Sequence, residues 1–201
     1  MCHAPGKIIK YSLILLLCLV VSQLLFYYLF DDFFVCIINT SFLTNIGLRV
    51  SFAYVLYIAS IYIIDRKISK IHIDLLAGIY FLMVLVLSLL REYHNYIFIN
   101  LNPLTIINDF DRYFNHTLII LIGNLLIYVP LGMYIKYKFN MTNLKLAMCF
   151  MPYILLLEAT QRITYRGIFD INDIITNIAG FVFGGICFTI FEKIRLGMPQ
   201  M

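Results

Sequence analysis

The residues best suited to chemistry lie near the C-terminal end, where Asp170, Asp173, Asn177, Gly180 and Gly184 follow one another at spacings of three, four, three and four. On an α-helix this spacing places all five on one face. The two carboxylates could act as a base or hold a hard cation such as Mg²⁺. They would equally suit the N-terminus of a helix, through capping and the helix dipole, so a structural role stays open.

The preceding segment supplies a second group of polar and charged residues, namely Glu158, Gln161, Arg162 and Arg166. Glu158 and Arg162 are four residues apart, so an ion pair within one helix is geometrically available. A purely structural role for this ion pair stays open. Ionisable groups in or beside a membrane helix are nevertheless functional candidates, and arginine is well suited to hold a phosphate or carboxylate.

A third group surrounds Asn124, which lies six residues into an apolar run that starts at Leu118. This offset corresponds to about 9 Å of helix. Asn177 lies seven residues after Asp170, so the two amides are expected at similar depths. Pro130 is expected to bend the same helix by removing a backbone hydrogen bond.

Prolines and glycines in these segments are expected to act structurally. Gly180 and Gly184 form a small-xxx-small pair, which lets the backbone of a neighbouring helix approach closely. The residues assigned to this structural group are Pro103, Pro130, Gly132, Gly180 and Gly184.

The elements that must position these residues are transmembrane helices. The 201 residues are 62% hydrophobic and only 13% charged, which leaves too little polar surface for a water-soluble globule. A span needs about 20 mostly apolar residues. We predict an all-α, polytopic integral membrane protein with about six transmembrane helices, over residues 8–30, 48–64, 73–90, 118–135, 144–163 and 174–191. Five helices are the alternative, because the second run is the weakest.

The distribution of charge orients these helices. With the N-terminus in the cytoplasm, ten of the fifteen Lys and Arg residues fall in the inner loops and termini, while eight of the eleven acidic residues fall outside. Cytoplasmic loops are enriched in Lys and Arg. We therefore predict a multi-pass membrane protein with both termini cytoplasmic and the polar candidates on the outer face.

The predicted organisation has three parts. Residues 1–90 hold helices one to three, residues 91–191 hold an outer loop and helices four to six, and residues 192–201 form a short cytoplasmic tail. The outer loop, residues 91–117, mixes aromatic and polar residues, which suits a segment at the lipid headgroups or one that faces a substrate. Segment 33–48 extends helix one, lies at the interface, or re-enters the membrane.

Several function classes find no support in the sequence. The net charge of +4 is explained by cytoplasmic lysines and arginines, and no basic stripe indicates nucleic acid. The five cysteines have no metal-type spacing, so no metal site is predicted. No cofactor and no oligomeric state follow from the residues.

Three sequence blocks together resemble the VanZ-like family of bacterial membrane proteins. They are Asn100–Ile107, with its Asn-Leu-Asn-Pro start; Asn124–Gly132, which ends in Pro-Leu-Gly; and Glu158–Gly180, which carries Arg166, Asp170, Asp173 and Asn177 in series. The second block usually has Phe where this chain has Tyr128. The resemblance covers about half of the chain, and its first two predicted helices carry no family motif.

The resemblance implies a link to glycopeptide resistance, since the family is named for a protein associated with low-level resistance to teicoplanin. Most members have no established biochemical activity. The hypothesis that follows is a cell-envelope protein that binds or alters an extracytoplasmic ligand, either a lipid-linked wall precursor or a glycopeptide. Its ligand site would comprise Asn124, Glu158, Gln161, Arg162, Arg166, Asp170, Asp173 and Asn177.

Two other function classes stay open. A membrane-embedded enzyme acting on a lipid-linked envelope precursor would use Asp170 or Asp173 as a base or metal ligand, but no Ser or His stands in a nucleophile arrangement. A small-molecule transporter would fit six helices with polar residues inside the membrane, although no inverted repeat is visible. Binding alone makes the fewest demands on the sequence.

Overall fold

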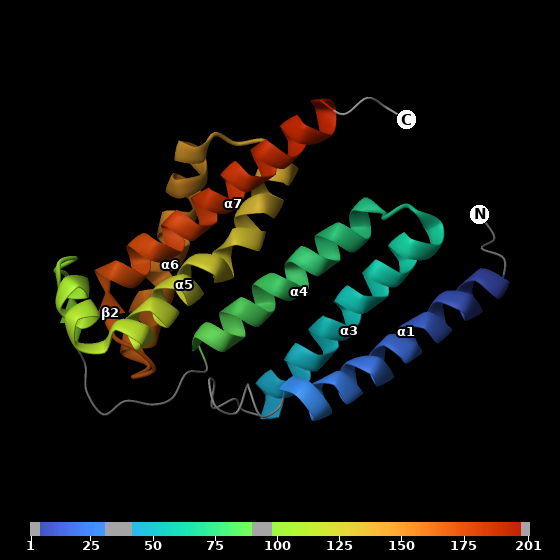
Figure 1. The fold of residues 1–201 in the computed structure, drawn as a ribbon, viewed down its shortest axis with the longest axis horizontal. Coiled ribbons are helices and arrows are strands. Elements are labelled where there is room, and N and C mark those ends of the chain that lie inside the picture. Colours follow the sequence, from blue (N-terminus) through green and yellow to red (C-terminus); the bar gives the residue numbers. More distant parts are fainter. Residues whose placement is uncertain (1–4, 31–41, 90–97, 198–201) are drawn as a thin grey trace. The chain divides into compact units, whose positions relative to one another are not determined.

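The described part of the chain consists mainly of helices. A computed structural model describes residues 5–30, 42–89 and 98–197 (Figure 1). Six helices in these ranges are long and apolar enough to cross a membrane, because each contains a run of about 20 mostly apolar residues. The prediction of an all-α, polytopic membrane protein is confirmed.

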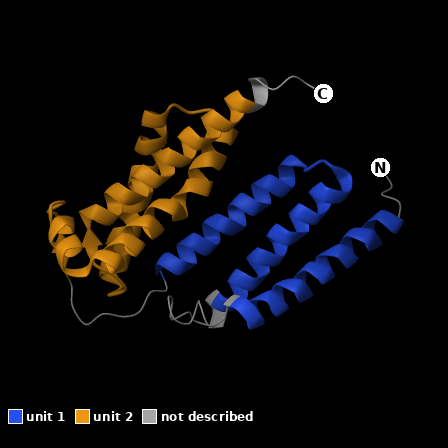
Figure 2. Cartoon of the chain, viewed as in Figure 1, with its two compact units in different colours: residues 1–91 blue, residues 92–201 orange. Residues whose placement is uncertain are grey.

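The chain divides into two compact units, residues 1–91 and residues 92–201 (Figure 2). Unit 1 contains α1 (Pro5–Leu25), the short π-helix η1 (Phe26–Phe30), α3 (Phe42–Asp65) and α4 (Lys70–Leu89). Unit 2 contains β1 (Ile99–Asn100), α5 (Thr105–Phe139), α6 (Asn143–Ile163), β2 (Phe169–Asp170) and α7 (Ile171–Gly197).

In unit 1, α3 packs against α1 on one side and α4 on the other. Small residues let α1 and α3 meet: the Ser22 hydroxyl donates to the Arg49 carbonyl oxygen at 2.6 Å, and Cys18 Sγ lies 3.8 Å from Ser60 Oγ. Cys18, Ser22 and Ala53 are all buried. Polar atoms between helices are thus satisfied locally, as an apolar environment requires.

In unit 2, a two-residue parallel pairing of β1 with β2 sets the direction of the helices that follow. Ile99 pairs with Phe169 and Asn100 with Asp170. Because α5 begins soon after β1 and α7 directly after β2, the two helices run in the same direction, and α6 returns between them along the chain (Figure 1). Helix α7 packs against both α5 and α6.

Glycines bring α5 and α7 into backbone contact. A Cβ atom added at Gly180 would lie 2.8 Å from the carbonyl carbon of Leu125 and even closer to the carbonyl oxygen of Leu125. Gly184 meets Val129 in the same way, and Gly132 of α5 meets Phe181. The glycine hydrogens therefore point at backbone carbonyl groups, a Cα–H···O arrangement common where helices cross closely.

Aromatic rings join α6 to the other two helices. The Phe150 ring of α6 stacks on the Phe181 ring of α7, with centroids 4.2 Å apart and planes 6° apart. The Tyr128 ring of α5, which is 2% exposed, meets Phe150 edge-on at 4.9 Å. At the other end of the interface, Gly185 lies against Leu146.

Several helix boundaries and the position of one helix break differ from the sequence prediction. Helix α5 begins at Thr105, so the connection from helix three is shorter than predicted, and α7 continues to Gly197. The break in helical geometry within α5 lies at Tyr113 (φ −140°, ψ 53°), while the backbone angles at Pro130 stay helical. Most of segment 33–48 lies outside the described residues, and its part from Phe42 onward belongs to α3.

The early start of α5 has a local cause. The side chain of Asn102 accepts a hydrogen bond from the Leu104 amide at 3.1 Å, and its carbonyl oxygen accepts from the Thr105 amide at 3.3 Å. Pro103 occupies the turn between them, where its fixed φ suits the approach to a helix. The polar residues that follow made this stretch resemble a loop.

Candidate functional site

Asp170 caps helix α7. Its carboxylate accepts a hydrogen bond from the Asn172 backbone amide at 2.8 Å, the bond of an N-cap residue. The Asn100 side-chain amide donates to both carboxylate oxygens at 3.1 Å, across the β1–β2 pairing. The structural interpretation left open by the sequence thus accounts for the contacts of Asp170.

Thr105 joins the beginnings of α5 and α7. Its hydroxyl oxygen accepts from the side-chain amides of Asn100 at 2.7 Å and Asn172 at 3.1 Å, and its hydroxyl donates to the Asn102 carbonyl oxygen at 2.9 Å. We name Asn100, Asn102, Thr105, Asp170 and Asn172 the cap network. Four of these residues were absent from the predicted site, although an Asx residue three positions before Thr105 and another two positions after Asp170 were available signals.

Asn124 and Asp173 join α5 to α7 directly. The Asn124 side-chain amide donates to an Asp173 carboxylate oxygen at 2.7 Å, and both residues are half-buried. The prediction placed Asn124 level with Asn177, one turn further along α7. The prediction counted depth from Leu118 in one helix and from Asp170 in the other, whereas α5 begins at Thr105, so the two counts did not share a common starting level.

Glu158 and Gln161 of α6 are each 2% exposed. The stack of Phe150 on Phe181 fixes the register of the antiparallel pair α6 and α7. Counting eight residues forward from Phe150 and eight back from Phe181 brings Glu158 level with Asp173. By this count the Glu158 and Asp173 carboxylates lie at one level along the helices of unit 2, and Asn124 is hydrogen-bonded to Asp173.

Asn177 continues the polar face one turn deeper. It is 5% exposed, and its side-chain oxygen has no hydrogen-bond partner in the part of the chain that the structure describes. A buried polar atom without a partner destabilises a fold by roughly 1–3 kcal/mol. We name Asn124, Glu158, Asp173 and Asn177 the polar cluster.

Helix α6 ends in a turn whose left-handed position is usually occupied by glycine. The Arg166 amide donates to the Gln161 carbonyl oxygen at 2.8 Å and the Tyr165 amide to the Arg162 carbonyl oxygen at 3.2 Å. These two bonds define a Schellman motif, with Tyr165 at the left-handed position (φ 58°). Gly167 then packs against Gln161, since a Cβ there would lie 3.2 Å from the Gln161 Cβ.

The predicted pair of Arg162 with Glu158 does not form through the Arg162 Nε atom, which is buried and has no hydrogen-bond partner among the described residues. Arg162 and Arg166 are both half-buried at the end of α6. Residues 5–30, 42–89 and 98–197 contain no group of three or more His, Cys, Asp or Glu side chains placed to hold a metal ion. The arrangement can donate and accept hydrogen bonds to a polar ligand.

The eight predicted site residues thus fall into three places. Asn124, Glu158, Asp173 and Asn177 lie in the polar cluster, and Asp170 lies in the cap network. Gln161, Arg162 and Arg166 lie at the C-terminal turn of α6.

Fold and composition together define a multi-pass, all-α membrane protein. Residues 75–192, more than half of the chain, match the model of the VanZ/LLP1 family, so the chain belongs to that family. The match begins within α4 and includes the cap network, the polar cluster and the α6 turn. No curated protein and no solved structure matches the chain.

Proposed function

We propose that unit 2 binds a polar extracytoplasmic envelope ligand at the polar cluster, and that this binding lowers susceptibility to teicoplanin-type glycopeptides. The observation that carries the proposal is the Asn177 side-chain oxygen, which is buried without a partner among the described residues, one turn from Asp173. A ligand hydroxyl or amide that donates to this oxygen would remove the cost of its isolation.

The neighbouring groups support a ligand rich in hydrogen-bond donors. Asp173 and Glu158 contribute carboxylates at one level of the unit, and Asn124 holds Asp173 in place through a 2.7 Å hydrogen bond. Hydrogen bonds to charged acceptors are among the stronger ones in proteins. Glycopeptides and lipid-linked wall precursors both present many amide and hydroxyl donors, so either class fits.

Binding is favoured over catalysis by the contacts of Asp170. The enzyme hypothesis relied on Asp170 and Asp173 as a pair, yet Asp170 already accepts from Asn100 and from the amide of Asn172. Its carboxylate is committed to holding the start of α7. A catalytic base or metal site built from this pair would therefore have only Asp173 available.

Orientation is part of the proposal. The polar cluster lies toward the ends of α5 and α7 that follow β1 and β2, and the bias of Lys and Arg along the sequence favours the extracytoplasmic side for these ends. We further propose a bacterial membrane with both termini in the cytoplasm. A cysteine placed at Tyr165, labelled only by a membrane-impermeant reagent added outside, tests this orientation; labelling only from inside contradicts it.

The test of function is teicoplanin susceptibility of a host that expresses the wild-type chain, Asn177→Leu, or Thr189→Val at matched membrane levels. Thr189 donates within α7 to the Gly185 carbonyl oxygen at 3.0 Å, so Thr189→Val is a control that also removes a polar group from α7. We expect reduced susceptibility with wild type and Thr189→Val, and vector-level susceptibility with Asn177→Leu.

Equal susceptibility for wild type and vector, or for wild type and Asn177→Leu, would contradict the proposal. Direct binding of fluorescent teicoplanin to the purified chain in nanodiscs then separates the two ligand classes. Saturable binding that Asn177→Leu abolishes identifies the glycopeptide. Resistance without teicoplanin binding favours the wall precursor.

A further inference from the structure

Unit 1 contains two adjoining cavities near the start of α1 and the end of α3. The first has a volume of about 470 Å³ and is lined by α1 residues from Lys7 to Leu15, with Tyr57 of α3. The second, of about 480 Å³, is lined by Asp65 of α3, by Lys67 in the following loop and by His72 of α4. Tyr11 and Tyr57 line both cavities, so the two share a wall.

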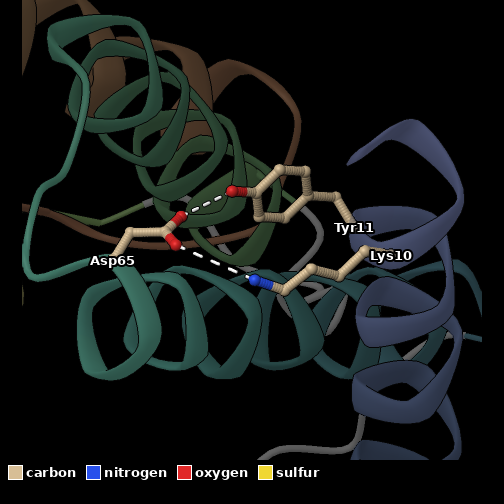
Figure 3. A network of polar contacts seen from close by, with 3 residues as sticks. All are labelled: Lys10, Tyr11 and Asp65. Atoms are coloured by element: carbon tan, nitrogen blue, oxygen red, sulfur yellow. Dashed lines mark hydrogen bonds and ion pairs between the residues drawn. The ribbon is translucent and has the colours of Figure 1, made fainter. Parts of the chain in front are cut away.

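The one acidic side chain lining these cavities is held in its own network. The Tyr11 hydroxyl donates to one Asp65 oxygen at 2.6 Å, and Lys10 Nζ lies 3.9 Å from the other (Figure 3). Lys10 also sits 5.4 Å from the centroid of the Tyr11 ring, a cation–π contact. The negative charge of Asp65 is therefore offset by Lys10 before any ligand arrives.

The remaining charge in the cavities is positive. Lys7 lines the first cavity and Lys67 the second, and both side chains are exposed. Within the ranges that the structure describes, neither has an ion-pair partner. Two ammonium groups thus line two adjoining cavities, where they attract an anion.

Aromatic contacts give the shared wall a defined shape. The rings of Tyr57 and His72 meet edge-on with centroids 6.0 Å apart, and the Tyr54 hydroxyl lies 3.2 Å from His72 Nδ1. These contacts fix α3 against α4 at the second cavity. Amphipathic tyrosine rings of this kind are typical of the level of the lipid headgroups.

The first cavity changes character along its length. It is cationic at Lys7 and apolar at Leu15, which lies about 12 Å further along α1 at a rise of ~1.5 Å per residue. Leu15 is 37% exposed, so the apolar end opens to the surroundings of the helices. A free phosphate would fill only the cationic end.

We infer that these cavities bind one anionic phospholipid, with its headgroup between Lys7 and Lys67 and an acyl chain along the apolar side of α1. A negatively charged headgroup complements the two lysines, and the acyl chain complements Ile8 and Leu15. Basic recesses between transmembrane helices are recognised sites for anionic headgroups. This inference concerns unit 1 and does not depend on the function proposed for unit 2.

The test compares two lipids with the same acyl chains, phosphatidylglycerol and phosphatidylcholine, by native mass spectrometry of the full-length chain in a mild non-ionic detergent. The measured quantity is the preference for phosphatidylglycerol, as a ratio of apparent dissociation constants. Each lysine near an anionic headgroup contributes roughly a fivefold preference. The double substitution Lys7→Gln, Lys67→Gln should therefore lower the preference by about 25-fold.

The control is Lys145→Gln, Lys193→Gln, which removes the same charge from exposed positions in unit 2. We expect this variant to keep the wild-type preference. The inference is overturned if both double variants lose preference equally, or if Lys7→Gln, Lys67→Gln leaves it unchanged. Competition by inorganic phosphate at the molar concentration of the lipid would also overturn it, because it would indicate a soluble-anion site.

Discussion

Replacing Gly180 by alanine tests the close contact between α5 and α7. The added Cβ would lie 2.8 Å from the carbonyl carbon of Leu125, whereas ordinary contact begins at 3.4 Å. The contact joins the α7 backbone at Gly180 to the α5 backbone at Leu125, and helix backbone cannot rotate away as a flexible side chain would. The two helices would have to separate by roughly 1 Å, a form of overpacking.

The expected cost has two parts. Overpacking at a tight contact costs about 1–3 kcal/mol. Asn124 immediately precedes Leu125, so separating the helices also lengthens its 2.7 Å hydrogen bond to Asp173; polar contacts between membrane helices contribute about 0.6 kcal/mol on average. A total of about 2–4 kcal/mol corresponds to roughly 5–15 °C of thermal stability for a chain of this size.

The assay is the temperature at which the detergent-solubilised protein loses its monodisperse peak on size exclusion, at one fixed heating time. Gly123→Ala is the matched control, since a Cβ at Gly123 in α5 meets nothing within 4 Å. Alanine is also the better helix former. If Gly180→Ala melted within a degree or two of Gly123→Ala, the reasoning about backbone contact would be refuted.

Two further predictions concern the ends of α6 and α7. Asp170→Ala should destabilise the protein by about 1–2 kcal/mol, because α7 loses its N-cap. Asp170→Asn should retain most of the stability, because it keeps an acceptor for the Asn172 amide. A stable Asp170→Asn variant that loses teicoplanin resistance would show that the charge itself has a function. Tyr165→Gly should stabilise the detergent-solubilised protein by about 0.5–1 kcal/mol, because glycine adopts the left-handed φ of 58° without steric cost. An unchanged or lower melting temperature in the same size-exclusion assay would contradict this expectation.

The helical elements could be predicted because each is specified by its own residues. A run of about 20 apolar residues must satisfy its backbone within a helix if it lies in lipid, whatever its neighbours are. The predicted runs 144–163 and 174–191 overlap closely with α6 (Asn143–Ile163) and with most of α7. The beginning of α5 was missed because Asn102 and Pro103 set it, within a stretch whose polar composition suggested a loop.

The candidate site was predicted only in part. Helical spacing alone identified the face that carries Asp173, Asn177 and Gly180, since residues three and four apart share a side. The role of Asp170 could not be decided from spacing, because a carboxylate at that position serves a cap and a ligand site equally well. Its bond to Asn100 depends on a pairing between residues seventy positions apart.

The sequence by itself determined that this protein consists of apolar helices with their polar residues on particular faces, because those properties depend on local periodicity. Only the tertiary structure decided which polar groups meet: Asn124 reaches Asp173, Glu158 lies level with them, and the Asn177 oxygen stays without a partner among the described residues. These contacts depend on the register between helices. That register is set by glycine–backbone contacts and ring stacking across the interface, neither of which any single segment specifies.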